Sequence, residues 1–241
     1  MAESYSVLGG FFEYLNADCD YAKWSQYLLN KVISANCGRR GLDIGCGNGY
    51  FTRAFNKAGF EVDGMDISPE MLTKARALAS KEGVRCEFLL GDICKLKLGK
   101  KVDFCLAVND CINYVPPQKL LSAFSHVCSA LTGSGAFFFD ISSQKKIREV
   151  LANNLFAEER EDMSYIWFNT QTDDGVKMDL TFFIKQPNGL YERAEETHYQ
   201  YAHSQESIVN ALKEAGFARV EYEQHPCSPE GERIQFCAYK R

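Results

Sequence analysis

Short apolar runs alternate along the chain with stretches in which apolar residues recur at helical spacing. The runs that predict strands span residues 41–44, 60–65, 84–90, 101–108 and 135–141, and the helical stretches span 50–57, 69–80 and 117–131. This alternation is typical of successive βα units, in which each helix packs its apolar face against the sheet. We therefore expect a parallel sheet with helices on both faces and right-handed crossovers.

The pattern changes after Ile141. Residues 144–156 have helical spacing, and three extended stretches follow at 163–172, 176–186 and 190–202. Asp-Asp-Gly and Pro-Asn-Gly separate these stretches, and both tripeptides are strong hairpin turns. The sequence therefore predicts an inserted helix and an antiparallel β meander. A helix over 204–215 and strands over 218–224 and 232–239 then rejoin the main sheet.

Ahead of the first strand, apolar residues at positions 24, 27, 28 and 32 have helical spacing. They predict a helical lid over residues 1–37. We expect residues 1–143 and 203–241 to form one α/β domain that includes this lid. The inserted unit at 144–202 would then form a roof over the substrate.

Composition narrows the class of protein. Of the 241 residues, 46% are hydrophobic and 24% are charged, as in ordinary globular proteins. The net charge of −5 lacks the basic surplus that non-specific nucleic-acid binding requires. The first residues show no signal-peptide pattern and no run of 18 apolar residues occurs, so we expect a cytoplasmic protein without a membrane partner. The ten cysteines form no Cys-x-x-Cys pair, and none has a histidine at zinc-ligand spacing, so we expect free thiols and no metal.

A glycine-rich turn follows the first predicted strand. Gly45, Gly47 and Gly49 let the backbone turn sharply and approach a ligand closely. The dinucleotide-binding fingerprint has its third glycine one residue later, where this chain has Tyr50. Asp43 lies two residues before the first glycine, and a carboxylate there favours a sulfonium or ammonium ligand over a pyrophosphate.

Two further carboxylates follow the next predicted strands. Asp66 lies 19 positions after Gly47, where an acidic side chain can accept hydrogen bonds from ribose hydroxyls. Asp92 follows the third strand, where it can accept an adenine amino hydrogen while Ile93 covers the ring. Either aspartate alone is more often a helix cap. Together, at successive strand ends, they predict a nucleoside pocket.

Residues 38–141 closely resemble the class I S-adenosylmethionine-dependent methyltransferases. Gly41–Gly49 is similar to the first motif of that family, Asp66-Ile67-Ser68 with Met71-Leu72 to the second, and Gly91-Asp92-Ile93 to the third. The resemblance implies a Rossmann-like, doubly wound sheet of seven strands with an antiparallel last strand. It also implies that S-adenosylmethionine is the cofactor and S-adenosylhomocysteine the product. The residues expected around the cofactor are Tyr5, Trp24, Asp43, Gly45, Cys46, Gly47, Asn48, Gly49, Asp66, Ile67, Met71, Asp92, Ile93, Asn109 and Tyr114.

A narrower likeness is to small-molecule methyltransferases with a helical lid and a β insertion, including sugar-amine N-methyltransferases. It is carried by Tyr5, Phe12-Glu13, Tyr21 and Trp24 in the lid, by Asn109–Tyr114 after the fourth strand, and by Trp167 and His198 in the insertion. Such lids often read Tyr-Asp where this chain has Phe12-Glu13. A tyrosine hydroxyl near the methyl donor would then come from Tyr5 or Tyr14, or be absent.

Three residues are candidates for the catalytic step: His198, Asp110 and Tyr14. Asp110 follows the fourth strand, beside the expected sulfonium. His198 shares a strand face with Glu196 and Gln200 and is the candidate general base if that face looks into the cleft. Alternatively, His198 is a structural residue.

We expect methyl transfer to a small polar metabolite, at nitrogen rather than oxygen, by a monomer or homodimer. Two alternatives stay open. One is an NAD(P)-dependent oxidoreductase on a related fold, and the other is a non-catalytic module that binds S-adenosylmethionine.

Overall fold

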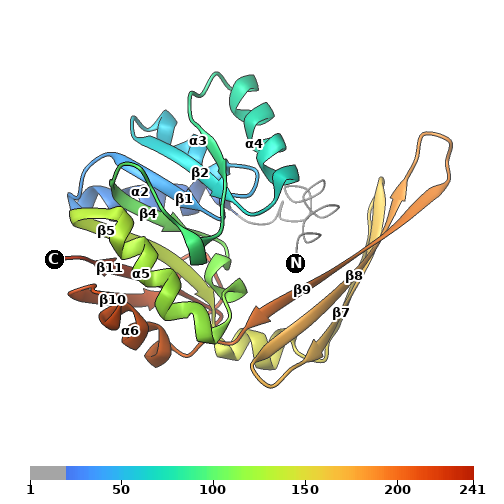
Figure 1. Ribbon diagram of the computed structural model, residues 1–241. Coiled ribbons are helices and arrows are strands. Elements are labelled where there is room, and N and C mark those ends of the chain that lie inside the picture. Colours follow the sequence, from blue (N-terminus) through green and yellow to red (C-terminus); the bar gives the residue numbers. More distant parts are fainter. Residues whose placement is uncertain (1–19) are drawn as a thin grey trace.

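A seven-stranded sheet forms the centre of the protein, which we describe for residues 20–241 from a computed structural model (Figure 1). Its strand order is β10-β11-β5-β4-β1-β2-β3. The strands are β1 (Arg40–Ile44), β2 (Glu61–Asp66), β3 (Phe88–Leu90), β4 (Val102–Ala107), β5 (Leu131–Ser142), β10 (Arg219–Gln224) and β11 (Arg233–Tyr239). Strands β1 to β5 are parallel, whereas β11 runs antiparallel to both β5 and β10. The predicted α/β fold and its antiparallel last strand are confirmed.

Helices cover both faces of this sheet. They are α2 (Tyr21–Ala35), α3 (Tyr50–Lys57), α4 (Pro69–Lys81), α5 (Leu120–Ala130) and α6 (Gln205–Glu214). Because side chains alternate along a strand, Phe104 and Phe138 pack beneath α2 and α3, while Cys105 and Phe139 pack beneath α5 and α6. The two apolar layers give the doubly wound arrangement that the βα rhythm predicted.

Residues near the start of each predicted helix indicate where the helix begins, as α4 shows. Ser68 accepts a hydrogen bond from the Met71 amide at 3.2 Å, and Pro69 occupies the first helical position of α4. Helix α2 is the part of the predicted lid that the structure describes. The earlier lid residues, including Tyr5, Phe12-Glu13 and Tyr14, lie outside the described residues. None of the described helices is long and apolar enough to cross a membrane.

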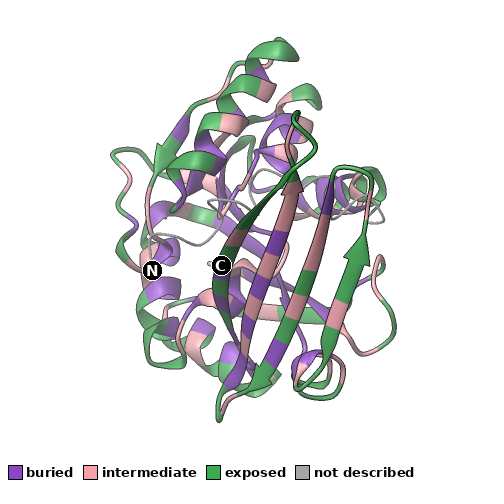
Figure 2. Ribbon diagram, turned by 90° about the vertical axis from the view of Figure 1, so that its right-hand side faces the viewer, coloured by how far each residue is buried: buried purple, intermediate pink, exposed green. Residues whose placement is uncertain are grey.

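The insertion forms a second sheet of four antiparallel strands in the order β6-β7-β8-β9, which we call the roof sheet. Its strands are β6 (Leu155–Glu159), β7 (Met163–Gln171), β8 (Gly175–Lys185) and β9 (Tyr191–Tyr201). Buried residues alternate with partly exposed ones along β8, and exposed and buried residues alternate over the second half of β9 (Figure 2). The buried face holds Met178, Leu180 and Phe182, which pack with Ile147 and Leu151.

The predicted helix over 144–156 is wrong in its second half. The structure has a short π-helix, η4 (Lys146–Leu151), and then the extra strand β6. Helix η4 ends at Ala152, whose backbone is extended (φ −59°, ψ 136°), and Asn153 follows with a left-handed φ of 54°. These two residues form a turn that the Asn154 amide closes by donating to the Leu151 carbonyl at 3.3 Å. The β6 backbone then pairs with β7, with Leu155 opposite Phe168, so pairing in the tertiary structure overrides the helical spacing.

Candidate active site

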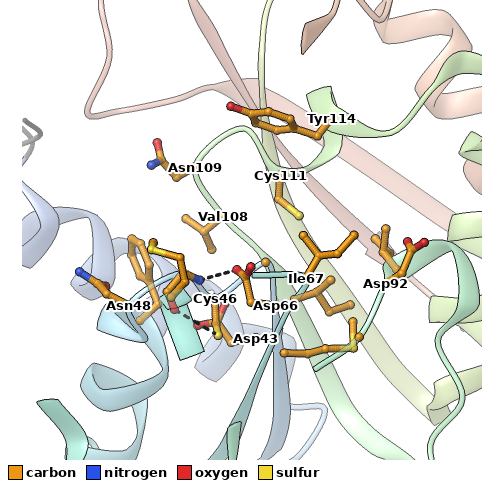
Figure 3. A pocket seen from close by; sticks show the side chains of 18 of the residues that line it. Asp43, Cys46, Asn48, Asp66, Ile67, Asp92, Val108, Asn109, Cys111 and Tyr114 are labelled. Carbon is orange, nitrogen blue, oxygen red and sulfur yellow. Dashed lines mark hydrogen bonds between the residues drawn. The ribbon is translucent and has the colours of Figure 1, made fainter. Parts of the chain in front are cut away.

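A cavity of about 960 Å³ opens at the carboxyl ends of β1, β2 and β4, where the strand order reverses direction, and it extends to β9. In open α/β sheets this reversal is where ligands bind. Twelve of the residues expected around the cofactor line it: Asp43, Gly45, Cys46, Gly47, Asn48, Asp66, Ile67, Met71, Asp92, Ile93, Asn109 and Tyr114. In Figure 3, Asp43 and Asp66 lie on the opposite side of the cavity from Asn109 and Tyr114.

The glycine turn presents bare backbone to the cavity. Gly45 and Gly47 have φ values of 67° and 55°, which residues with a Cβ rarely adopt. A Cβ on Gly45 would lie 2.5 Å from the Cys111 sulfur. The Gly47 amide donates to Asp66 Oδ2 at 2.8 Å, so the end of β2 fixes the turn.

Gly49 has a different role from the one expected. It caps α3 with a φ of 76° and is not among the residues that line the cavity. A Cβ there would lie 2.7 Å from the Phe88 ring. This glycine therefore allows close packing of α3 against β3 and α4.

Asp43 is a buried carboxylate at the wall of the cavity. Its side chain is 1% exposed, and Oδ2 accepts a hydrogen bond from the Thr52 hydroxyl at 2.7 Å. Burial raises the pKa of Asp43 to about 7. A cationic group in the cavity would favour the ionised form, so this carboxylate suits a cation.

Asp66 and Asp92 both line the cavity, and each also accepts a hydrogen bond from a backbone amide nearby in the sequence. The Ser68 amide donates to Asp66 Oδ1 at 2.9 Å, and the Cys94 amide donates to Asp92 Oδ1 at 2.8 Å. A carboxylate has about four acceptor positions, so both retain capacity for a ligand. Burial raises the pKa of Asp66. Beside it, Ile67 is 58% exposed and gives an apolar surface that a planar ring could cover.

Two thiols also line the cavity. Burial raises the pKa of both Cys46 and Cys111 above the usual value for a thiol. Both side chains are therefore protonated near neutral pH, and a thiol in that form is a poor nucleophile. They contribute surface to the cavity rather than covalent chemistry.

The turn after β4 forms the opposite wall. Asn109 lines the cavity, and the short 3₁₀ helix η2 (Cys111–Tyr114) follows. Asn113 is fully buried, and its amide nitrogen donates to the carbonyls of Ser142, at 3.0 Å, and Tyr201, at 2.9 Å. Asn113 therefore joins η2 to the end of β5 and to the roof sheet.

Asp110 does not line this cavity. Its carboxylate contacts Arg233 Nη1 at 2.7 Å and accepts a hydrogen bond from the Ser142 hydroxyl at 2.8 Å. Burial opposes ionisation of Asp110, but the charges of Arg233 and Lys146 outweigh it and hold the pKa below its usual value. An ionised carboxylate already paired with a guanidinium is a poor proton acceptor, so this placement does not favour a catalytic role.

His198 lies one layer behind the cavity. Its ring is 2% exposed, Nε2 is 3.1 Å from a Glu196 carboxylate oxygen, and the ring contacts Tyr114 edge to face. The face shared by Glu196, His198 and Gln200 is the buried face of the roof sheet. Because β9 is an edge strand, residues from both of its faces reach the cavity: Glu195, Glu196, Thr197, Tyr199 and Tyr201.

On the lid helix, Tyr21 lines the cavity and Trp24 packs behind it. The two rings are stacked with centroids 6.1 Å apart, and Trp24 also contacts Phe51 and His225 edge to face. Tyr21 is the first residue of α2. The likeness of the lid to that of small-molecule methyltransferases, which includes Tyr21, is the sequence signal that could have identified it. Other lining residues outside the expected set include Tyr50, Phe51, Val108, Cys111, Lys119, Glu195 and Glu196.

Known proteins resemble this chain over its whole length. A family model described as a methyltransferase domain matches residues 42–135. YqeM of Bacillus subtilis (strain 168), a methyltransferase by its name, is 30% identical over 247 residues, which cover 98% of this chain and 97% of that protein. A crystal structure of an S-adenosylmethionine-dependent methyltransferase from Clostridium acetobutylicum is 28% identical, with a TM-score of 0.86 and 95% of each chain covered.

The sugar N-methyltransferase KedS8 from Streptoalloteichus shares the fold. Its TM-score is 0.78 at 17% identity, and the match covers 95% of this chain and 91% of that one. This likeness extends to the whole architecture, because both chains are covered almost completely.

The described residues fit S-adenosylmethionine. Asp43 beside the open glycine backbone suits a cationic group, Asp66 offers acceptors to hydroxyl groups, and Ile67 offers an apolar surface. The family relationship sets aside the nicotinamide alternative. The chain belongs to the S-adenosylmethionine-dependent methyltransferases, and S-adenosylmethionine is its cofactor.

Proposed function

We propose that this enzyme methylates a nitrogen atom of a small polar metabolite. The observation that carries the proposal is the carboxylate of Glu196, which lines the cavity and belongs to a residue that is 5% exposed. Glu195 lines the cavity too, but it pairs with Arg193. Carboxylates attract an amine in its ammonium form and accept its hydrogen bonds. The shared fold with a sugar N-methyltransferase supports the same choice.

The proposed mechanism is an in-line displacement. When bound, S-adenosylmethionine supplies an electrophilic methyl group on a sulfonium. The protein's contribution is orientation and exclusion of water rather than covalent chemistry. Tyr21 from the lid, Tyr114 from η2 and Tyr199 from the roof sheet supply aromatic walls for this task.

An amine must lose a proton before it can attack the methyl group. We assign Glu196 as the proton acceptor because it both lines the cavity and is 5% exposed. His198 contacts its carboxylate at 3.1 Å and can share the proton. His198 thus keeps its proposed place in the proton transfer, but acts through Glu196.

A release assay tests this function. The protein is incubated with S-adenosylmethionine and matched pairs of amino and hydroxyl compounds, such as amino sugars and their parent sugars, and S-adenosylhomocysteine is measured by mass spectrometry. We expect turnover with members of the amino series. Turnover with only the hydroxyl series would contradict the choice of nitrogen. Tight cofactor binding without turnover of any compound or cell extract would favour the non-catalytic module.

A further inference from the structure

A strained turn carries the acceptor-side wall of the cavity. Asn109 and Asp110 both adopt left-handed backbone conformations, with φ values of 61° and 63°. Asparagine and aspartate tolerate this region better than most residues, but two in succession need support from their surroundings. The turn places Asn109 and Cys111 at the cavity while directing Asp110 away from it.

One buried carboxylate holds both amides of this turn. Asp140 Oδ1 accepts a hydrogen bond from the Asn109 amide at 2.7 Å, and Oδ2 accepts one from the Asp110 amide at 3.2 Å. Asp140 is fully buried near the carboxyl end of β5. Its two oxygens therefore fix the direction in which the chain leaves β4.

Arg233 compensates the charge at this point. Its guanidinium bonds to Asp140 and contacts the Asp110 carboxylate, with Nη1 2.7 Å from Oδ1 and Nη2 3.2 Å from Oδ2. Without that guanidinium, two carboxylates would share a buried site and repel each other. Protonation of Asp140 would relieve the repulsion but would weaken it as an acceptor for the turn amides.

The same guanidinium also supports the lid. Its central carbon lies 5.1 Å from the centroid of the Trp24 ring, an arrangement typical of cation–π contacts. Trp24 in turn stacks on Tyr21, which lines the cavity. Arg233, on β11, thus contacts residues that support two parts of the cavity wall, although it does not line the cavity itself.

We propose that Arg233 is a positioning residue that fixes the Asn109–Asp110 turn and the Trp24–Tyr21 pair for methyl transfer. The inference rests on the proposed function, because it assigns this turn to the acceptor side. It explains the pairing of Asp110 with Arg233, and it gives Asp140 a role in backbone geometry.

Hydrogen exchange measured by mass spectrometry tests the proposal without an acceptor. The variants are R233M, R233K and the matched control R219M, whose arginine is exposed and pairs with Glu221. In R233M we expect the peptide that contains residues 108–114 to exchange about tenfold faster, as the loss of charged hydrogen bonds implies. The exchange rate of this peptide in R233K should lie between those of R233M and the unchanged protein. A lysine retains the positive charge but lacks the planar set of donors with which the guanidinium binds both carboxylates. R219M should match the unchanged protein in this peptide.

A double variant separates positioning from general loss of stability. In R233M/D110N the repulsion is gone and Asp140 can again hold the turn, so protection of residues 108–114 and affinity for S-adenosylhomocysteine should recover in part. Unchanged exchange in R233M, or no recovery in the double variant, would overturn the proposal. If R233M does not fold, as judged by circular dichroism, R233K is compared with the unchanged protein. Faster exchange of residues 108–114 is then expected, and unchanged exchange would overturn the proposal. Hydrogen exchange and affinity for S-adenosylhomocysteine are measured without turnover. A failure of the proposed function in the release assay can therefore be distinguished from a failure of this inference.

Discussion

At the scale of single residues, carboxylates in and behind the wall of the cavity differ in their environments. Asp43 is buried against Thr52, Asp66 accepts two backbone amides, and Asp110 is paired with Arg233. Their side chains are chemically identical, yet burial raises the pKa of the first two while the guanidinium lowers that of the third. The environment of each therefore decides whether it suits a cation, a hydroxyl group or a structural ion pair.

The raised pKa of Asp43 predicts how cofactor affinity depends on pH. Below pH 7 the free protein holds a proton on Asp43, whereas a bound cation favours the ionised form. Binding must then release the proton, so affinity should rise with pH up to about 7 and level off above it. The raised pKa of Asp66 acts in the same direction. Isothermal titration between pH 5.5 and 8 in two buffers measures both affinity and proton release, and D43N should remove most of the dependence. An affinity that does not change between pH 5.5 and 8 would contradict the role of Asp43 in binding the cationic cofactor.

Asp66 gives a second prediction at this scale. D66A should weaken binding of S-adenosylmethionine by about 1 to 3 kcal/mol, through loss of charged hydrogen bonds and of the anchor for the Gly47 amide. D63A, on the same strand, is the matched control, because Asp63 accepts the Glu87 amide and does not line this cavity. Equal affinities of D66A and the unchanged protein would remove Asp66 from the cofactor site.

The proposed proton path through Glu196 gives a third. E196Q should lower kcat by about 10² to 10⁴, the usual contribution of a general base. H198A should lower turnover less, and neither change should alter cofactor affinity. E192Q is the control, because Glu192 lies on β9 outside the cavity. If H198A lost cofactor affinity by the same factor as it lost turnover, His198 would be a structural residue.

At the scale of elements, the sequence predicted the main sheet well because its signals are local. Capping residues such as Ser68 and turns such as the one before Gly175 act within a few positions of the chain. Strand β6 was not predicted because its pairing partner β7 provides the decisive interaction, and helical spacing at Ile147 and Leu151 extended the prediction too far. The turn at Asn153, which follows the end of η4, needs a backbone conformation that asparagine permits but does not require.

Asn153 allows this explanation to be measured. N153A and N153G both lose the side-chain acceptor for the Gln171 amide, which is bound at 3.0 Å. Only alanine also incurs the steric cost of the left-handed backbone, so N153A should be less stable than N153G by about 1 kcal/mol. Urea denaturation gives the difference in the free energy of unfolding. Equal stabilities would contradict the role of the left-handed backbone in the turn that follows η4.

At the scale of the whole molecule, the two halves of the site differ in how far the sequence predicts them. The half expected to hold the cofactor is built at the carboxyl ends of β1 and β2 and just after β3, so residue spacing predicted that Asp43, Asp66 and Asp92 would lie together. The acceptor half depends on contacts between distant parts of the chain, such as Asn113 with Tyr201. The ion pair between Asp110 and Arg233 also joins distant parts of the chain. No pattern in the sequence around either residue could reveal it.

The central claim is that this methyltransferase acts on nitrogen. The most direct measurement is the carbon-13 spectrum of the product formed from S-adenosylmethionine with a labelled methyl group, using an acceptor identified in the release assay. We predict a single labelled methyl resonance, with the shift and couplings of a methyl group on nitrogen. A labelled methyl group on oxygen or carbon would contradict the account.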